Sequence, residues 1–458
     1  MDAKSLRNRL RRALSGTLPA LALAAGLGAT PAAAQSLQEA LAQAYQSNPT
    51  LDAERAALRA TDEQVPYARS GFLPNVTATG EAGRVRNEQG PDVVAISPRS
   101  VDVTVTQPLY RGGRTVAAVN RAENLVQAQR ASLVATEQSV LLDAATAYLD
   151  VVRDQAVLDL TVNNEQVLRR QLEAAQDRFR VGEITRTDVS QSESRLARST
   201  SDRIQAEGLL NASRAQFARL IGAPPARLVQ PTVTVALPKT LQETIALGEQ
   251  NNPNVIAARF NQQASEDNID LVRGELLPSV SVAGTLSKNW DQSQLVDESE
   301  QASIVARVTV PIYEGGATTA RVREAKQVAN QRRIQIEETS RAARETAIRA
   351  WEALVTARAS ILSRQEQVRS ADIALEGVRQ EATVGSRTVL DVLDAEQELL
   401  NARVELVRSQ RDELVAVFQV LAATGQLTAG RLGLPVATYD FQAHYDKVRG
   451  KLWGTSID

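Results

Sequence analysis

The sequence has 458 residues, a formal net charge of −2, no cysteine and only 3% aromatic residues. The near-zero net charge offers no basic surface for nucleic acid, and the lack of cysteine excludes disulfides, thiolate zinc sites and cysteine nucleophiles. Few aromatic side chains leave little bulk for large globular cores. The dominance of Ala, Gln, Glu, Arg, Val and Leu favours long helices that pack along narrow seams.

The first 34 residues have the pattern of a secretory signal peptide. Four arginines between positions 7 and 12 precede an apolar run from Leu18 to Ala29, and Ala32-Ala33-Ala34 forms a small-residue cleavage site. The apolar run is short and contains Pro19 and Gly26, which argues against a membrane anchor. We therefore predict an exported protein whose mature chain begins at Gln35.

The rest of the chain contains the same plan twice, at an offset of 203 or 204 residues. In chain order, the matching segments are Asn48-Pro49 with Asn252-Pro253, Leu73-Pro74 with Leu277-Pro278, 107–113 with 310–316, and Val181-Gly182 with Val384-Gly385. A constant offset and order indicate two similar halves related by a pseudo-rotation. We therefore divide the chain into a first repeat at 35–229, a second repeat at 230–429 and a C-terminal tail at 430–458, which we expect to be irregular.

Each repeat is expected to open with a helix, at about 36–65 and at about 240–273. Ser36 with Glu39, and Thr240 with Glu243, fit capping boxes at the helix starts. The Asn-Pro pairs predict a turn that divides each helix into two pieces.

Two strand-like segments follow in each repeat, which gives four strands per chain. Valines at 101, 103 and 105 alternate with Asp102, Thr104 and Thr106, and residues 304–310 alternate in a similar way. Weaker alternation at about 74–85 and 278–290 predicts the partner strands, with polar loops at 87–98 and 292–301. Strands of about ten residues match a tilted bilayer crossing, and a soluble sheet with one buried face explains them equally well.

Four strands cannot close a barrel by themselves. An open edge in lipid leaves backbone N–H and C=O groups without partners, which is costly. A membrane-spanning form therefore requires several chains in one ring, with eight strands from two chains or twelve from three.

Glycine pairs follow the second strand of each repeat, at Gly112-Gly113 and Gly315-Gly316. We predict that they let the chain bend from strand into helix. A phosphate-binding loop is the alternative, but no Lys-Ser or Lys-Thr pair follows the glycines.

Long helices without proline come next, at about 114–180 and about 317–383. About 67 residues at 1.5 Å per residue span about 100 Å, several times the size of a compact domain. Apolar residues recur every seven positions, which predicts coiled-coil packing; they are Val119, Val126, Leu133, Val140 and Ala147, and in the second repeat Val322, Ala329, Ile336, Ala343 and Ala350. After Val181-Gly182 and Val384-Gly385, returning helices are expected at about 186–221 and 387–424.

The duplicated plan, the two Tyr-x-Gly-Gly turns and the segment 384–394 (Val-Gly-Ser-Arg-Thr-Val-Leu-Asp-Val-Leu-Asp) resemble the TolC-like outer-membrane channel family. The resemblance covers about residues 36–427. It implies a homotrimer in the outer membrane of a Gram-negative bacterium, with a twelve-stranded membrane β-barrel continued by a twelve-helix α-helical coiled-coil tube across the periplasm. It also implies a channel without catalytic activity or cofactor.

The same resemblance implies the partners of the channel. An inner-membrane transporter of the RND or ABC type would pass cargo through a periplasmic membrane-fusion adaptor into the exit duct, and outer-membrane lipid would surround the barrel. Multidrug efflux and type I protein secretion are both consistent with it, and the tail from Gly433 to Asp446 resembles the ends found in the type I secretion branch.

The resemblance also assigns roles near the hairpin turns. Asp391 and Asp394 lie one helical turn apart, and the family places such residues at the entrance constriction, where threefold repetition forms stacked acidic rings that bind cations. The plainer interpretation is two solvated carboxylates near a helix N-terminus, favoured by the helix dipole.

Arg387 is expected to lock the closed entrance against Asp188 and Thr187 of a neighbouring hairpin, and Ala382 stands where the family often carries a tyrosine in this lock. An ordinary exposed ion pair, worth about 0–1 kcal/mol, is the alternative. The turns themselves are expected to dock the adaptor, through Val181, Gly182, Val384 and Gly385.

Other classes of protein explain the sequence less well. A periplasmic or secreted coiled-coil scaffold or adhesin is the main alternative, and the paired alternating strands argue against it. The single histidine, His444, has no visible partners for a metal site or a catalytic triad, so we expect no dedicated metal site. An exported hydrolase is the third alternative, but the sequence offers no nucleophile–base set or carboxylate pair in a credible pocket, so we do not expect an enzyme.

Overall fold

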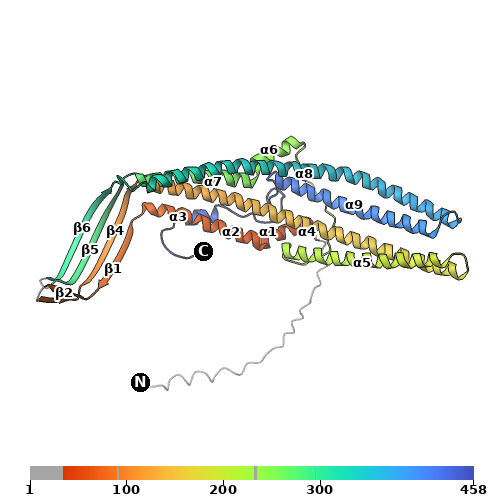
Figure 1. Ribbon diagram of the computed structural model, residues 1–458, viewed down its shortest axis with the longest axis horizontal. Helices are drawn as coiled ribbons and strands as arrows, with labels where there is room; N and C mark the ends of the chain where they lie inside the picture. The colour runs from red at the N-terminus through yellow and green to blue at the C-terminus, as the bar shows by residue number, and fades with distance from the viewer. Residues whose placement is uncertain (1–34, 90–91, 232–234, 294–295, 458) are drawn as a thin grey trace, which may run out of the picture.

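The computed structural model describes residues 35–89, 92–231, 235–293 and 296–457. The expected signal peptide lies outside the described residues. The molecule is elongated, with a sheet at one end and the turns of two helical hairpins at the other (Figure 1). Shorter helices and the C-terminal segment lie against the middle of the long helices.

The opening helix of each repeat is divided as predicted. The first repeat has α1 (Leu37–Ser47), α2 (Pro49–Asp62), α3 (Gln64–Arg69) and a 3-10 turn η1 (Ser70–Phe72), and the second has α6 (Leu241–Asn251), α7 (Pro253–Arg273) and η2 (Gly274–Leu276). Ser36 and Glu39 form the expected capping box. Asn48 divides α1 from α2, because its side chain accepts from the Thr50 N–H at 2.9 Å and donates to the Leu220 carbonyl at 3.0 Å.

The sheet contains strands from both repeats, in the antiparallel order β1 (Asn75–Ala82), β4 (Arg99–Arg111), β5 (Ser279–Ser293) and β6 (Val296–Thr309). The β4–β5 pair joins the first repeat to the second. Within the described residues, β1 and β6 are the edges of this sheet.

The prediction of polar loops at 87–98 and 292–301 was wrong. Strands β2 (Val85–Gln89) and β3 (Asp92–Ile96) form a separate two-stranded hairpin, and β5 and β6 remain paired as far as Ser293 and Val296. Ion pairs explain why β5 and β6 stay paired in this polar segment, because Lys288 of β5 contacts Glu298 and Glu300 of β6. Cross-strand charge pairs of this kind stabilise a sheet without any apolar residue.

The alternating segment of β4 points its valines outward. Val101, Val103 and Val105 are exposed, whereas Asp102 and Thr104 are partly covered. On the covered face the hydroxyl oxygen of Thr104 lies 3.2 Å from that of Thr285 in β5. A soluble sheet buries its apolar residues, so this arrangement favours a sheet that meets lipid on its valine face.

The long helices have the predicted bounds. They are α4 (Arg114–Arg180) with its returning helix α5 (Arg186–Ile221), and α8 (Ala317–Thr383) with α9 (Val389–Ala423). Most of the seven-residue seam is buried, including Val126, Leu133, Val140 and Ala147 in α4 and Ala329, Ala343 and Ala350 in α8. Among the described residues, no helix combines the length and apolar character needed to cross a membrane.

The main core lies in the middle of the molecule, where α1 and α2 pack on α4 and the ends of α5 and α9 meet. Tyr148, Phe217 and Phe418 are fully buried there. The Tyr148 hydroxyl accepts from the Val229 N–H at 3.1 Å and lies 2.6 Å from the Val229 carbonyl, so it ties α4 to the segment that leaves the first repeat. Trp351, its counterpart in α8, is only partly covered.

The tail is less irregular than predicted, because it includes α10 (Ala443–Val448) and packs on the core. His444 holds α10 to α2, with Nδ1 3.0 Å from Oδ2 of the buried Asp62. Arg130 of α4 donates to the Phe441 carbonyl at 3.2 Å and lies over the ring of Tyr445. The polar composition of the tail concealed these contacts, which involve aromatic and charged side chains together.

Candidate functional site: the hairpin turns and their first helical turns

The two hairpins turn back through an exposed valine and a glycine. Val181 and Val384 are 72% and 79% exposed, and Gly182 and Gly385 have φ angles of 80° and 81°. The chain closes each turn with a backbone hydrogen bond, from Glu183 to the Arg178 carbonyl and from Ser386 to the Glu381 carbonyl. Because residues with a side chain rarely adopt such a φ, glycine is the natural choice at both turns.

Asp188 and Asp391 occupy the same place in the two hairpins, as capping residues of the returning helices. Oδ2 of Asp391 accepts from the backbone N–H and the hydroxyl of Thr388, each at 2.9 Å, and Asp188 accepts from Thr185 in the same way. These hydrogen bonds from Thr388 lower the pKa of Asp391, and those from Thr185 lower the pKa of Asp188. The local geometry of Asp391 is therefore that of a carboxylate that caps a helix N-terminus, and its role in the entrance remains a prediction.

Arg387 pairs with Glu381 of its own hairpin, with 2.9 Å between Nε and Oε2. The hydrogen bond to Glu381 is the main reason that the pKa of Arg387 is raised. In the described part of this single chain, no hydrogen bond or ion pair joins Arg387 to Asp188 or Thr187. The expected lock therefore requires contact between copies, and it stays a prediction.

Asp394 forms an ion pair with Arg195 of α5, which joins the second hairpin to the first. Arg195 is not among the site residues predicted from the sequence. A signal was present, because the counterpart of Arg195 at the offset of 203 is Glu398 and the counterpart of Asp394 is Gln191. The two repeats thus place opposite charges where their hairpins meet.

Two further polar links join α9 to the first hairpin. Glu396 is buried and accepts from Gln171 of α4 at 2.6 Å and from Arg379 of α8 at 2.7 Å. Farther from the turns, Arg411 donates to Asp150 of α4 at 2.8 Å. Helix α9 is therefore attached to the first hairpin at three levels, of which the Arg195–Asp394 pair is the one nearest the turns.

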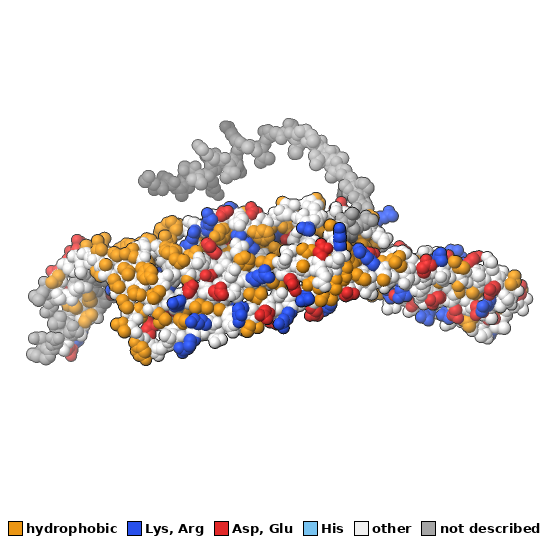
Figure 2. Space-filling view, turned by 90° about the horizontal axis from the view of Figure 1, so that it is seen from above, with side chains coloured by type: hydrophobic (Ala, Val, Ile, Leu, Met, Phe, Trp, Pro, Cys, Tyr) orange, Lys and Arg blue, Asp and Glu red, His pale blue; other side chains and the backbone are white. Residues whose placement is uncertain are grey.

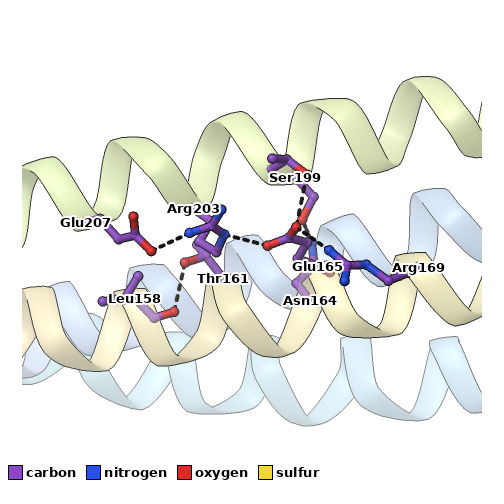
Figure 3. A network of polar contacts seen from close by, with 9 residues as sticks. Leu158, Thr161, Asn164, Glu165, Arg169, Ser199, Arg203 and Glu207 are labelled. Atoms are coloured by element: carbon purple, nitrogen blue, oxygen red, sulfur yellow. Dashed lines mark hydrogen bonds and ion pairs between the residues drawn. The ribbon is translucent and has the colours of Figure 1, made fainter.

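The first hairpin has a polar brace of its own between α4 and α5 (Figure 3). The carboxylate of Glu165 accepts from Arg203 Nε at 2.6 Å and from Arg169 at 3.0 Å, and Asn164 donates to the Ser199 hydroxyl at 3.1 Å. The counterparts of Glu165 and Arg203 in the second hairpin are Val368 and Leu406. The second hairpin therefore lacks this particular brace, and its helices are joined by other ion pairs, such as Arg379 with Glu396 and Arg403 with Asp372.

The glycine pairs lie where each repeat passes from strand to long helix. Gly112, Gly113, Gly315 and Gly316 all have φ between 62° and 84°. Gly113 and Gly316 cap α4 and α8, and Gly112 packs against the backbone of Gly274. The glycine pairs therefore lie at the strand-to-helix bends where we predicted them.

A metal site is not present in the part of the chain that the structure describes, since no three His, Asp or Glu side chains lie close enough to share an ion. Cation binding in the expected acidic rings would involve several copies.

Comparison with known proteins gives a consistent result. The family model described as "Outer membrane efflux protein" matches residues 40–223 and 245–426. The outer membrane efflux protein BepC of Brucella suis biovar 1 is 32% identical over 424 residues, which cover 92% of each chain. The outer membrane protein TolC of Vibrio cholerae is 29% identical, over 89% of this chain and 95% of that one. The solved outer-membrane channel OprN has the same fold, with a TM-score of 0.76 at 20% identity over 85% of this chain and 90% of that one.

Proposed function

This chain belongs to the outer membrane efflux protein family, and from that premise we propose that three copies form one exit duct through the outer membrane. It is an outer-membrane channel protein of the efflux and secretion type. The duct is passive, with no reaction of its own. It receives cargo from an inner-membrane transporter of the RND or ABC type by way of a periplasmic adaptor.

The observation that carries this proposal is the sheet. Its β4 strand is exposed on the valine face and partly covered on the Asp and Thr face, and its two edge strands have unpaired outer sides within the described residues. Three such sheets, joined edge to edge, supply the twelve strands of a closed barrel with lipid outside and water inside. Figure 2 is in keeping with this, since hydrophobic side chains gather toward the end that carries the sheet.

The opposite, narrow end of the molecule has the polar surface expected of a channel entrance that lies in water. Lys, Arg, Asp and Glu side chains are spread over it in Figure 2, and hydrophobic side chains are fewer there than toward the sheet. We assign Asp391 and Asp394 to the entrance constriction, and Arg387 to a lock with Asp188 and Thr187 of a neighbouring copy. The exposed turns at Val181-Gly182 and Val384-Gly385 are the surface on which the adaptor docks.

A deletion strain tests the proposed function. We expect the strain to lose export, seen either as greater sensitivity to drugs or as loss of a secreted protein, and a plasmid copy of the gene to restore it. Two unchanged phenotypes, together with a protein that stays soluble without detergent, would favour a periplasmic scaffold instead.

Arg387→Ala tests the lock in the same strain. Because the lock holds the entrance closed, we expect the variant to admit antibiotics such as vancomycin and to raise single-channel conductance. Arg369→Ala is the matched control, because Arg369 pairs with an exposed glutamate of its own helix, Glu366, as Arg387 pairs with an exposed glutamate of its own hairpin. Equal leakage in the two variants would count against the lock.

A further inference from the structure

We propose that residues 449–457, which follow α10, form a membrane-interface anchor, in which Trp453 lies among the phospholipid headgroups on the periplasmic side of the outer membrane. This inference deepens the proposed function, because it rests on the sheet lying in that membrane. The partner of the segment is lipid and not another protein. The anchor helps to fix the depth at which the channel sits in the bilayer.

The tail uses its apolar side chains in two different ways. Up to α10 they pack on the main core, and these residues are Leu432, Leu434, Val436, Tyr439, Phe441 and Tyr445. Beyond α10 they point away from the protein, since Leu452, Trp453 and Ile457 are 65%, 88% and 90% exposed. Three large apolar side chains exposed so close together mark a surface that contacts something other than water.

The exposed segment is a closed loop. The Lys451 N–H donates to the Val448 carbonyl at 2.9 Å, and the Lys451 ammonium donates to the Ser456 carbonyl at 2.6 Å. Gly454 has a φ angle of 94° and lets the chain reverse directly after Trp453. The loop therefore holds the tryptophan near its tip instead of leaving it on a loose end.

The loop is attached beside the end of the sheet where the helices begin. Arg69 of α3 donates to the Arg449 carbonyl at 3.1 Å, and the C-terminal end of the chain lies near α3 in Figure 1. On the other side of η1, Gln107 of β4 donates to the Phe72 carbonyl at 2.9 Å. Two hydrogen bonds thus connect the loop, through α3 and η1, to a strand of the sheet.

This attachment sets the depth of the loop relative to the bilayer. The chain advances about 10–15 Å from Arg69 to the first strand residue, Asn75, since it is partly helical and partly extended. The headgroup layer of a bilayer is about 5–8 Å thick on each side of the hydrocarbon. Side chains at the tip of a loop fixed at Arg69 therefore reach the headgroups and not the middle of the bilayer. Tryptophan and tyrosine are enriched at that depth in membrane proteins, because their rings are apolar and carry one polar group.

The surroundings of the loop have the same character. Exposed apolar side chains lie at the junction of α3, η1 and β4, and they are Tyr67, Phe72 and Leu109. Cations predominate over acids in residues 446–457, with Asp446 as the acid and Lys447, Arg449 and Lys451 as the cations. Long basic side chains can lay their stems on apolar surface while their charges meet lipid phosphates. Aromatic and basic residues together at this level therefore favour lipid as the partner.

Quenching of tryptophan fluorescence by spin-labelled lipid tests the anchor. The chain has three tryptophans, so Trp290→Phe with Trp351→Phe leaves Trp453 as the reporter. In vesicles of phosphatidylethanolamine and phosphatidylglycerol, Trp453 should lose more fluorescence to a label near the headgroup than to a label at the end of the acyl chain. In the matched control, Trp290→Phe with Trp453→Phe leaves Trp351 in the middle of α8, which should lose little fluorescence to either label.

A reporter in the sheet separates the possible failures. Val103→Trp, in a chain whose native tryptophans are all replaced by phenylalanine, should be quenched by the label at the end of the acyl chain if the sheet lies in the bilayer. No quenching there would refute the proposed function, on which the anchor rests. Quenching there, with Trp453 quenched no more than Trp351, would refute the anchor and leave the channel intact. Quenching of Trp453 by iodide in the water alone, or protection of Trp453 from iodide and lipid label alike by a neighbouring copy, would also overturn the anchor.

Discussion

Alanine at Gly112 and alanine at Gly315 should have different effects, although the two glycines are repeat counterparts. Their φ angles are nearly the same, 62° and 63°. A Cβ at position 112 would overlap the carbonyl oxygen of Gly274 and lie 2.9 Å from Cβ of Leu277, whereas a Cβ at position 315 meets nothing within 4 Å. Only the first substitution therefore forces the backbone apart.

The size of each effect follows from these contacts. A left-handed conformation costs an alanine about 1–2 kcal/mol, and this cost applies to both variants. Inserting a methyl group into a filled space costs about 1–3 kcal/mol more, and this cost applies to Gly112→Ala alone. We expect Gly112→Ala to lose about 2–5 kcal/mol of stability and Gly315→Ala about 1–2 kcal/mol.

Thermal unfolding of the purified proteins in one detergent measures the difference. The melting temperature should fall in both variants and should fall further for Gly112→Ala. Equal shifts would show that the contact with Gly274 is unimportant. A larger shift for Gly315→Ala would refute the reasoning, since that position has open space around it.

The remaining predictions concern the core and the turns. Tyr148→Phe should reduce stability by about 0.5–1.5 kcal/mol, because it removes the hydrogen bonds to Val229. Trp351→Phe, at the equivalent and only partly covered position, should cost less. Equal melting temperatures for the two variants would contradict this expectation. The lowered pKa of Asp391 means that its cap stabilises the fold above the ordinary aspartate pKa and loses that contribution only as pH falls through the lowered value. Hydrogen exchange in the first turn of α9 should therefore show no loss of protection on acidification from neutral pH to about pH 5, and a loss in that range would be inconsistent with the cap.

The long helices could be predicted from sequence because their limits are marked by strong local signals. The runs at 114–180 and 317–383 contain no proline and lie between Gly-Gly pairs and Val-Gly turns, and the structure places α4 and α8 at these bounds. The strands at 74–85 and 278–290 were found through alternation. The same approach failed at 292–301, because paired charges such as Lys288 with Glu300 have the composition of a loop.

Contacts between segments that lie far apart in the chain could not be predicted from the sequence. The link between Asp62 and His444 spans 382 positions, and nothing local at either residue indicates the other. The charges at the hairpin turns are an intermediate case. Asp391 was predicted from its motif. The charge difference at Arg195 could be read from the repeat, whereas its pairing with Asp394 required the structure, which shows which faces of the two hairpins meet.

The central claim is that this protein conducts solutes through the outer membrane, and current through the purified protein tests it most directly. We predict that the protein reconstituted in a planar lipid bilayer gives a stable current whose reversal potential in a salt gradient shows preference for cations, and that Asp391→Asn reduces this preference. A bilayer that conducts no better with the protein than without it would contradict the account.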